Sequence, residues 1–367
     1  MKDVMGIINL VEPAELLKDL TNHRTLGAVP IGGRYRLIDF VLSNMVNAGL
    51  RNVGIFVQEQ YRALMDHLGT GREWDLNRQR DGLFILPPDY RGEERNSGDI
   101  EILHRHYDYF ERSRQDTVIM AGTSMVCNID YQKALAYHDE KNADITVIYH
   151  KSRGPSNLST IFSLNSDQKV TGIQVNPLHA KEDNVSMKMY IMSKQLLMEL
   201  VDLCLCRGET DFVKDGLIKN LSQLNIYGYC FNGYVASINS LQAYYKHSME
   251  LLDPNIWEEL FFRSGLIYTK VKNEAPAQYG HKAKVSNCLV ANGCMIDGTV
   301  ENSILFRGVR IQKGVHIKGS ILMQRSEIKE NAMLEGVILD KDVVITEGKH
   351  LLGDPGYPLV IGKKTVL

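Results

Sequence analysis

The sequence predicts an α/β domain with a mostly parallel, Rossmann-like sheet, followed by a parallel β-helix. Two patterns lead to this fold class. In residues 1–150, short apolar strands alternate with amphipathic helices, which is typical of a parallel sheet covered by helices on both faces. From Lys282 onward, apolar residues and glycines recur every six positions, the signature of a β-helix. A polar stretch around Pro276 separates the patterns, so we expect domains at 1–271 and 282–367 with a linker at 272–281.

The α/β domain is predicted from runs of β-branched residues and from helical spacing of apolar residues. We expect strands at 5–9, 52–57, 117–121, 145–149, 186–192 and 226–231, and helices at 36–48, 131–142, 196–205 and 239–250. Ligands of such sheets bind beyond the carboxyl ends of the strands. The loops after Asn9 and after Ala121 are therefore the expected positions of any site.

The β-helix is predicted from two apolar series that keep a period of six residues. A small β-sandwich with chance periodicity is the alternative, and it is less favoured because both series hold their register. Cys288 and Cys294 are also six residues apart, so we expect them to stack in the core. The two series are Val309, Val315 and Ile321, and Ile311, Ile317 and Met323.

The composition is that of a soluble globular protein. Of the 367 residues, 44% are hydrophobic and 23% are charged, with a net charge of −2. No basic excess points to nucleic acid, and no apolar stretch approaches the ~18 residues of a membrane span. No export signal is recognisable, which favours the cytoplasm. The six cysteines lack C-x-x-C spacing and are expected to be free thiols.

The most distinctive motif is Ile31-Gly-Gly-Arg-Tyr-Arg-Leu-Ile-Asp-Phe. Together with Leu17-Lys-Asp-Leu-Thr-Asn-His-Arg, Thr210-Asp-Phe-Val-Lys-Asp and the C-terminal hexads, it resembles the bacterial ADP-glucose pyrophosphorylase (glucose-1-phosphate adenylyltransferase) family. The resemblance covers essentially the whole chain in order. It implies a nucleotidyltransferase α/β domain, a left-handed parallel β-helix, and a tetramer that works in glycogen biosynthesis.

The chain departs from the family at the loop after the first strand. Active members have a glycine-rich loop there, whose backbone N–H groups bind the nucleotide phosphates. Here no glycine occurs between Gly6 and Gly27, and Pro13 lacks an N–H. Glu12 and Glu15 would place negative charge beside a triphosphate, and Leu16 stands where the family has an arginine.

The family's two magnesium-binding aspartates correspond to Thr123 and Ser237 in this sequence. Mg²⁺ prefers carboxylate oxygen, and nucleotidyl transfer depends largely on neutralisation of charge by the metal. Further substrate-facing positions are changed as well. The family's phosphate-facing lysine corresponds to Leu26, its Glu-Lys-Pro motif to Val175-Asn-Pro, and a loop arginine to Ser97.

With these combined losses, the chain resembles the GlgD-type subunit of Gram-positive bacteria, the non-catalytic partner in heteromeric ADP-glucose pyrophosphorylase. The resemblance implies a regulatory subunit that is catalytically inactive or very weak. We expect no cofactor or metal on this chain, with Mg²⁺ at the catalytic partner subunit. The expected assembly is a heterotetramer, and a homo-oligomer is possible when the chain is alone.

Several family positions are retained. Arginines matching Arg24 and Arg36 bind phosphorylated effectors in relatives, and the bidentate guanidinium suits that role. Arg34 lies in the same segment, and His23 replaces an activator-sensing lysine. Salt bridges at the surface or between subunits are the alternative role for these arginines.

Other retained positions match residues around the nucleotide and the sugar in relatives. They form a vestigial pocket, or they are kept because the fold needs them, which is the favoured interpretation. These positions are Gln58, Gln60, Gly98, Gly122, Ser186, Asp211 and Lys214.

Two other functions compete with the regulatory interpretation. The chain could be an active nucleotidyltransferase in which Asp99 or Glu101 supplies a replacement metal ligand. A remote alternative is a hexapeptide-repeat acyltransferase, for which His316 and His350 are the candidate catalytic residues.

Overall fold

The computed structural model describes residues 3–12, 17–58, 60–88, 98–152, 159–179, 182–354 and 356–367. They form two compact units. The first comprises Met1–Glu12, Phe40–Val235 and Phe262–Tyr268, and the second comprises Pro13–Asp39, Ala236–Phe261 and Thr269–Leu367. The units interleave along the sequence, whereas the expected limits at 271 and 282 divide it into consecutive blocks.

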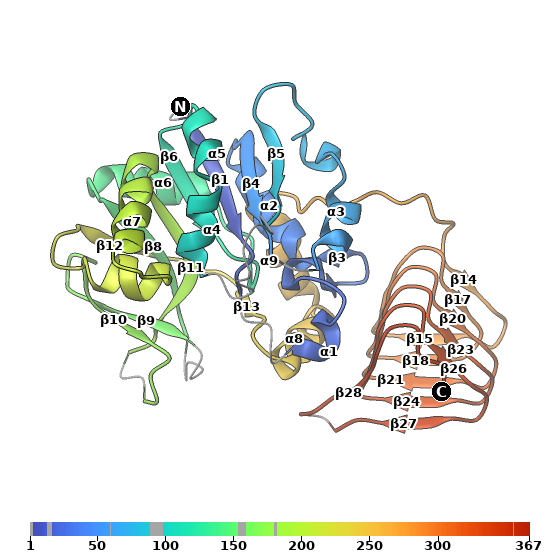
Figure 1. Cartoon of the computed structure of the whole chain (residues 1–367). Coiled ribbons are helices and arrows are strands. Elements are labelled where there is room, and N and C mark those ends of the chain that lie inside the picture. Colours follow the sequence, from blue (N-terminus) through green and yellow to red (C-terminus); the bar gives the residue numbers. More distant parts are fainter. Residues whose placement is uncertain are drawn as a thin grey trace. The chain divides into compact units, whose positions relative to one another are not determined.

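The first unit contains a nine-stranded sheet (Figure 1). Its main path runs in the order β10 (Val170–Val175), β9 (Thr160–Leu164), β11 (Asn184–Ser193), β6 (Thr117–Ala121), β1 (Val4–Asn9), β4 (Asn52–Phe56) and β5 (Gly82–Leu86). Strands β6, β1, β4 and β5 are parallel neighbours. Strand β11 is antiparallel to β6 and to β8 (Ile145–Lys151), and β12 (Ile226–Cys230) is parallel to β8. Every strand expected in this domain is present.

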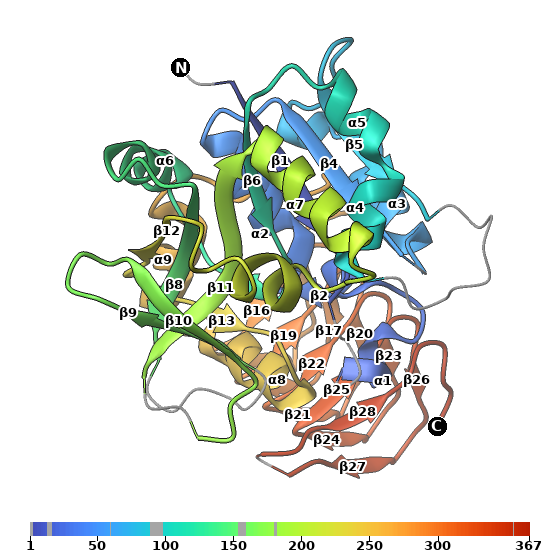
Figure 2. The same ribbon diagram turned by 60° about the vertical axis from the view of Figure 1, so that its left-hand side comes forward.

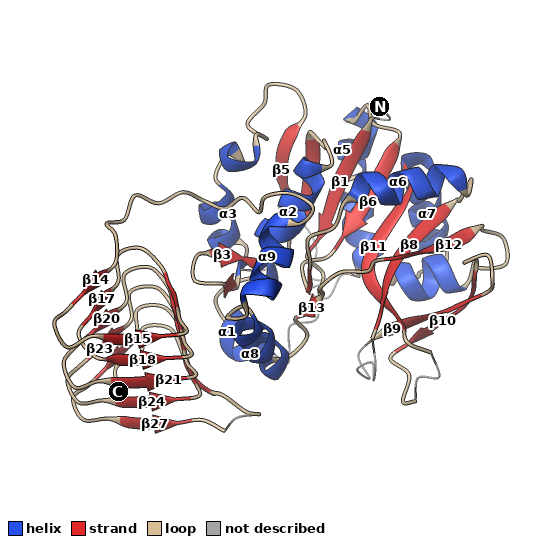
Figure 3. Ribbon diagram, turned by 180° about the vertical axis from the view of Figure 1, so that it is seen from behind, coloured by secondary structure: helices blue, strands red, loops and turns tan. Residues whose placement is uncertain are grey.

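Helices cover both faces of the sheet. Helices α4 (Asp99–Arg105), α5 (Tyr107–Arg112) and α7 (Lys194–Cys206) lie on one face (Figure 2), and α2 (Leu37–Asn47) and α6 (Tyr131–Glu140) on the other (Figure 3). The alternation of strand side chains produces this arrangement. A Cβ on Gly6 would meet Met45 of α2, whereas Met5 and Ile7 belong to the core that includes residues of α4 and α7. The remaining helical elements of this unit are α3 (Arg62–Leu68), η3 (Arg72–Trp74) and the π-helix η4 (Phe212–Ile218).

The second unit combines the C-terminal β-helix with short elements from two earlier stretches of the chain. Two tyrosines of helix α8 (Leu241–Glu250) anchor the helix within this unit. Tyr244 donates to the carbonyl of Pro30 (2.7 Å), and Tyr245 donates to the carbonyl of Gly319 in the β-helix (2.5 Å). The short elements are α1 (Lys18–Thr21), η2 (Leu26–Ala28), β2 (Pro30–Ile31), β3 (Tyr35–Arg36), β13 (Ala236–Ser237), α8 (Leu241–Glu250) and α9 (Pro254–Phe262).

The β-helix consists of three parallel sheets of five strands each, stacked coil upon coil (Figure 1). The first sheet contains β14 (Gln278–Tyr279), β17 (Met295–Ile296), β20 (Arg310–Ile311), β23 (Glu327–Ile328) and β26 (Val344–Ile345). The second contains β15 (Lys284–Ser286), β18 (Thr299–Glu301), β21 (His316–Lys318), β24 (Met333–Glu335) and β27 (His350–Leu352). The third contains β16 (Leu289–Val290), β19 (Ile304–Leu305), β22 (Ile321–Leu322), β25 (Val337–Leu339) and β28 (Leu359–Ile361). The predicted fold class is confirmed.

Glycine suits the backbone geometry at one corner of the coil. Gly314 has a φ of +71°, and a Cβ there would lie 2.2 Å from Oδ1 of Asn331. An L side chain at this position would be strained and would also clash with the next coil.

The six-residue period places residues on successive sides of one coil, not above one another. Stacked residues are a full coil apart, as Leu289 is with Ile304 and Ile304 with Ile321. The expected stacking of Cys288 on Cys294 is therefore wrong. Cys294 is buried, Cys288 is half-buried, and all six cysteines are free thiols.

None of the described helices is both long enough and apolar enough to cross a bilayer.

Adjacent residues of β24 provide a test of the coil core. Leu334 is 1% exposed and Met333 is 44% exposed. We expect Leu334→Ala to lower the free energy of unfolding by about 2–5 kcal/mol, because it leaves a cavity in the core. Met333→Ala should change it by less than about 0.5 kcal/mol. Urea denaturation followed by circular dichroism measures both; equal losses would contradict the assigned register.

Candidate functional site

The carboxyl ends of β1, β4 and β6 lie at one edge of the sheet, because the three strands are parallel neighbours. Two hydrogen bonds fix the chain as it leaves β1. The N–H of Leu10 donates to the carbonyl of Phe56 (3.1 Å), and the N–H of Val11 donates to Oδ1 of Asn9 (3.2 Å). The next residue, Glu12, thereby comes beside the loop that follows β6.

The Glu12 carboxylate accepts four hydrogen bonds from that loop. Oε2 accepts from the N–H of Thr123 (2.8 Å) and from its hydroxyl (2.7 Å). Oε1 accepts from the N–H of Ser124 (3.0 Å) and from its hydroxyl. Thr123 is 1% exposed and Ser124 5%. The donors at the end of β6 are thus bound to an anion that belongs to the chain itself.

Gly122 makes room for this carboxylate. A Cβ at Gly122 would lie 2.5 Å from Oε1 of Glu12. A phosphate oxygen placed at the same donors would overlap the carboxylate and meet its negative charge. At 4 Å, two unit charges repel by about 4 kcal/mol at an effective dielectric constant of 20. The edge that would receive phosphates in an active site is therefore negative and filled. The positions Pro13, Glu15 and Leu16 lie outside the described residues.

The residues at the end of β6 do not fit a Mg²⁺ site. Mg²⁺ takes carboxylate oxygens in near-octahedral geometry. Thr123 offers a hydroxyl that already donates to Glu12, and both oxygens of Glu12 accept from two donors each. The second family position, Ser237, lies in β13 of the other unit and also carries a hydroxyl. Within the described ranges, no group of three His, Cys, Asp or Glu side chains is placed to hold a metal ion.

The retained sugar-side positions have hydrogen bonds within the fold. Oδ1 of Asp211 accepts from the N–H of Lys214 (2.8 Å) at the start of η4, and the two side chains also form an ion pair (3.3 Å). The hydroxyl of Ser186 accepts from the N–H of Lys188 (3.0 Å). A Cβ on Gly98 would lie 2.2 Å from the carbonyl oxygen of Thr210, so glycine is needed for this close approach. Each of these four positions thus makes a contact within the fold.

Asp99 joins two segments next to these residues. Its Oδ1 accepts from the N–H of Phe212 (2.8 Å) and of Ile100 (3.0 Å). Burial raises the pKa of Asp99 to about 6, and the charge of Asp211 also raises it. The carboxylate thus fastens the start of α4 to η4. Glu101, the other candidate replacement ligand, lies within α4, and Ser97 is outside the described residues.

Gln58 and Gln60 follow β4 at the same edge of the sheet. Gln58 is half-buried, and Gln60 is exposed with a φ of +56°. Of the candidate pocket residues, the structure brings Gly122 to Glu12, Gly98 to Thr210 and Asp211 to Asp99. His316 and His350, considered for acyl transfer, are exposed on β21 and β27.

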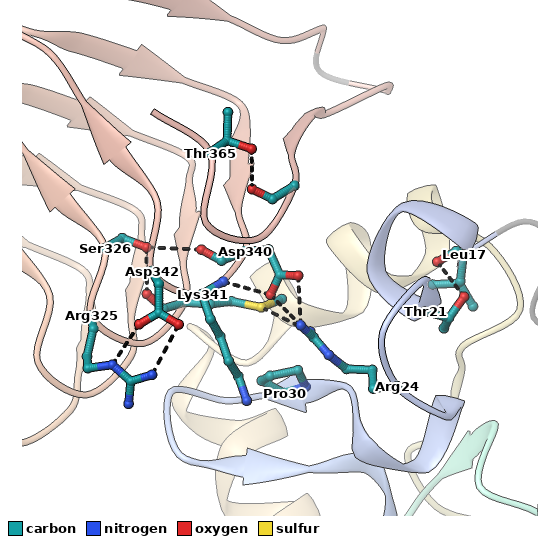
Figure 4. A network of polar contacts seen from close by, with 12 residues as sticks. Leu17, Thr21, Arg24, Pro30, Arg325, Ser326, Asp340, Lys341, Asp342 and Thr365 are labelled. Atoms are coloured by element: carbon teal, nitrogen blue, oxygen red, sulfur yellow. Dashed lines mark hydrogen bonds and ion pairs between the residues drawn. The ribbon is translucent and has the colours of Figure 1, made fainter. Parts of the chain in front are cut away.

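The second unit contains a buried ion pair (Figure 4). Nη2 of Arg24 donates to Oδ1 (2.8 Å) and Oδ2 (2.7 Å) of Asp340. The Arg24 side chain is 3% exposed and that of Asp340 is 2%. The N–H of Lys341 also donates to Oδ1 of Asp340 (2.7 Å). The pair joins the turn after α1 to the β-helix.

Arg24 also belongs to a basic cluster, which we define as Arg24, Arg36, Lys272 and Lys341. Burial, together with the charges of Arg36, Arg24 and Lys272, lowers the pKa of Lys341 to about 7, whereas the charge of Asp340 raises it. Such a cluster favours a bound anion, because each added negative charge relieves repulsion among the cations.

Comparisons with known proteins agree with this architecture. The family model described as "Nucleotidyl transferase" matches residues 14–254, and "GlmU-like, C-terminal hexapeptide" matches residues 273–355. The chain is 41% identical over 364 residues to "Glycogen biosynthesis protein GlgD" of Bacillus subtilis (strain 168), which covers 99% of this chain and 96% of the relative. It is 42% identical over 314 residues to the protein of the same name from Geobacillus stearothermophilus, covering 85% and 82%.

The chain belongs to the nucleotidyl transferase family, in the branch of the GlgD glycogen biosynthesis proteins. It is also 31% identical over 338 residues to "Glucose-1-phosphate adenylyltransferase" of Bacillus thuringiensis (strain Al Hakam), covering 90% of each chain. The hexapeptide match and the three five-stranded sheets agree with the predicted left-handed β-helix.

In this GlgD-branch protein the four candidate effector residues occupy different environments. Arg24 is buried against Asp340, and Arg36 is half-buried beside Lys341. Arg34 and His23 are exposed. Leu26, at the position of the family's phosphate-facing lysine, is buried with 6% exposure.

Sequence reasoning missed the partners of these residues. Ser124, which binds Glu12, was not singled out. Nor were Asp340, which binds Arg24, and Lys341, which lies near Arg24 and Arg36. Glu12 was recognised only as an obstacle to phosphate. Its neighbour Thr123 lies 111 positions away in sequence. No local pattern relates residues at such separations.

The buried Arg24–Asp340 pair and the exposed Arg325–Asp342 pair form a matched comparison, because both have a shortest N–O distance of 2.7 Å. We expect Arg24→Met or Asp340→Leu to lower the free energy of unfolding by about 3–5 kcal/mol, since each leaves an unpaired buried charge. Removing Arg325 should cost less than about 1 kcal/mol. The Arg24→Met/Asp340→Leu double variant should recover much of the loss in urea denaturation; fully additive losses would contradict the pairing.

Lys341 should make anion binding depend on pH. With a pKa near 7, Lys341 is charged at pH 6 and mostly neutral at pH 8.5. Sulfate keeps its charge in this window, so its affinity should fall several-fold from pH 6 to pH 8.5 in isothermal titration calorimetry. Lys341→Met should remove most of this dependence. Lys318→Met is the control, because Lys318 is exposed and paired with Glu335 on β24; an equal effect of both substitutions would count against the role of Lys341.

Proposed function

We propose that this chain is the regulatory subunit of a glucose-1-phosphate adenylyltransferase and that its own catalytic activity is absent or very weak. The enzyme would convert ATP and glucose 1-phosphate into ADP-glucose and diphosphate for glycogen biosynthesis in the cytoplasm. The proposal is carried by one observation: the Glu12 carboxylate occupies the donors at the end of β6, beside Thr123.

The chemistry of the reaction gives this observation its weight. Nucleotidyl transfer needs a divalent cation and positive groups that neutralise the phosphates as charge shifts. At the corresponding family positions this chain has Thr123, Ser237 and Leu26, and it adds Glu12. Two metal-binding carboxylates and one phosphate-facing cation of the family are thus replaced by uncharged side chains, and a carboxylate is added beside Thr123. We therefore infer that the chain binds no catalytic metal and that Mg²⁺ acts at a catalytic subunit.

The catalytic partner in this proposal is a homologue with the same two-part fold. Support comes from the 31% identity to a glucose-1-phosphate adenylyltransferase over 90% of both chains. Related subunits can occupy equivalent positions in a symmetric assembly, because their contact surfaces descend from the same one. We propose a heterotetramer; a homo-oligomer is the corresponding assembly of the chain alone.

The basic cluster suits a phosphorylated effector. Arg36 and Lys341 retain positive charge that Asp340 does not neutralise, and guanidinium and ammonium groups both bind phosphate. Arg24 would attract the effector through its positive charge without a direct contact, because its guanidinium is hydrogen-bonded to Asp340. Regulation would then consist of an anion bound at the second unit altering the catalytic partner.

Activity measurements test the regulatory role directly. With Mg²⁺, ATP and glucose 1-phosphate, the purified chain should form diphosphate at less than about 1/1000 of the rate of a catalytic homologue, since the metal supplies several kcal/mol of transition-state stabilisation. Adding the chain to the catalytic homologue should change kcat/KM or its response to effectors.

Turnover by the isolated chain comparable to that of its active relatives would overturn the proposal and favour an active enzyme with replacement ligands. Asp99→Asn and Glu101→Gln would then identify the ligand by loss of activity. Oligomeric state, measured by light scattering with and without the homologue, serves as the control that the two chains assemble.

A further inference from the structure

The loop of Gly122, Thr123 and Ser124 has the donor set of an anion-binding site. Two successive backbone N–H groups and two hydroxyls converge on one carboxylate, at 2.7–3.0 Å for the three bonds from Thr123 and the N–H of Ser124. All four donors bind the same side chain. Successive N–H groups that point to one position form a concave site for oxyanions.

The donors are built into rigid parts of the unit. Thr123 is 1% exposed and Ser124 is 5% exposed, and both follow β6 in the middle of the sheet. Gly122 leaves open the space that a Cβ would fill. Removing the carboxylate would thus leave four oriented donors in a largely buried position, and unsatisfied buried donors are costly.

Glu12 comes from a different part of the chain and is held less extensively. Its backbone follows the Asn9 turn and the Leu10–Phe56 hydrogen bond. The side chain is half-buried. The site and its occupant can therefore be separated by changing Glu12 alone.

We propose that residues 122–124 form an oxyanion site whose resident ligand is the Glu12 carboxylate, and that removing this side chain admits a free oxyanion. A small carboxylate such as formate reproduces the two oxygens of Glu12, and orthophosphate presents oxygens with similar acceptor chemistry. This inference goes beyond the proposed function and holds whether or not the chain is catalytic, since it concerns binding alone.

The test compares Glu12→Ala with Glu12→Gln. Alanine opens the space and removes the charge, whereas glutamine removes the charge but keeps the space filled. Thermal denaturation is followed in formate, in orthophosphate and in chloride at equal ionic strength. For Glu12→Ala we expect formate and orthophosphate to raise Tm over chloride by roughly 2–4 °C more than they do for the wild type. Glu12→Gln should show no such excess.

Two controls locate the effect. Phosphate bound by the basic cluster stabilises the wild type and the variants alike, so only the excess reports on residues 122–124. Adding Thr123→Val and Ser124→Ala to Glu12→Ala removes both hydroxyl donors and should abolish the excess. A crystal structure of Glu12→Ala grown in formate should show the anion on the N–H groups of Thr123 and Ser124.

An equal anion response of Glu12→Ala, Glu12→Gln and the wild type would overturn the inference, as would an excess that survives loss of both hydroxyls. If Glu12→Ala does not fold in chloride, refolding in formate or orthophosphate becomes the measurement. Recovery of the native circular dichroism spectrum supports the site, and no recovery refutes it. Loss of the anion effect leaves the proposed regulatory function standing, because that depends on turnover.

Discussion

The functional edge of the sheet depends on one interaction, the binding of the Glu12 carboxylate by the loop after β6. A carboxylate removed from water needs donors, and buried donors need an acceptor. Thr123 and Ser124 meet both needs with two N–H groups and two hydroxyls. The interaction closes the edge where ligands of parallel sheets bind, and it supplies negative charge at the position of a phosphate. One residue thereby satisfies the donors of the loop and places a carboxylate at this edge of the sheet.

In the second unit the buried charge that needs a partner is a cation. Arg24, buried in the turn after α1, has its counter-ion in Asp340 of the β-helix. Loss of either partner of such a buried pair is strongly destabilising, because it leaves the other charge buried and unpaired. The pKa of the neighbouring Lys341 is lowered mainly by burial and also by the charges of Arg36 and Arg24, whereas Asp340 raises it. Arg24 is therefore a structural cation, held by Asp340 within the second unit.

Relatives with the name of a catalytic enzyme share the architecture of this chain, so the fold does not distinguish catalytic from regulatory members. The distinction lies in a few side chains at fixed positions. The hydroxyls of Thr123 and Ser237, at the positions that correspond to the family's magnesium-binding aspartates, are compatible with the same strands, because those residues follow or end short strands whose hydrogen bonds involve the backbone. A chain can thus lose metal-dependent chemistry and keep the surfaces through which related subunits assemble.

The sequence by itself determined six of the nine strands of the large sheet, helices α2, α6, α7 and α8, and the hexad repeat, because burial and backbone hydrogen bonding impose periods of two, 3.6 and six residues that can be read locally. It also identified the residue types at Thr123, Ser237 and Arg24. It did not predict β5, β9 and β10 or helices α3, α4 and α5. Only the tertiary structure decided what these residues contact: Glu12 for Thr123, Asp340 for Arg24, and a full coil rather than six residues between stacked positions. Such contacts join residues far apart in the chain, and the charge and space that select them exist only once the sheet and the coils have formed.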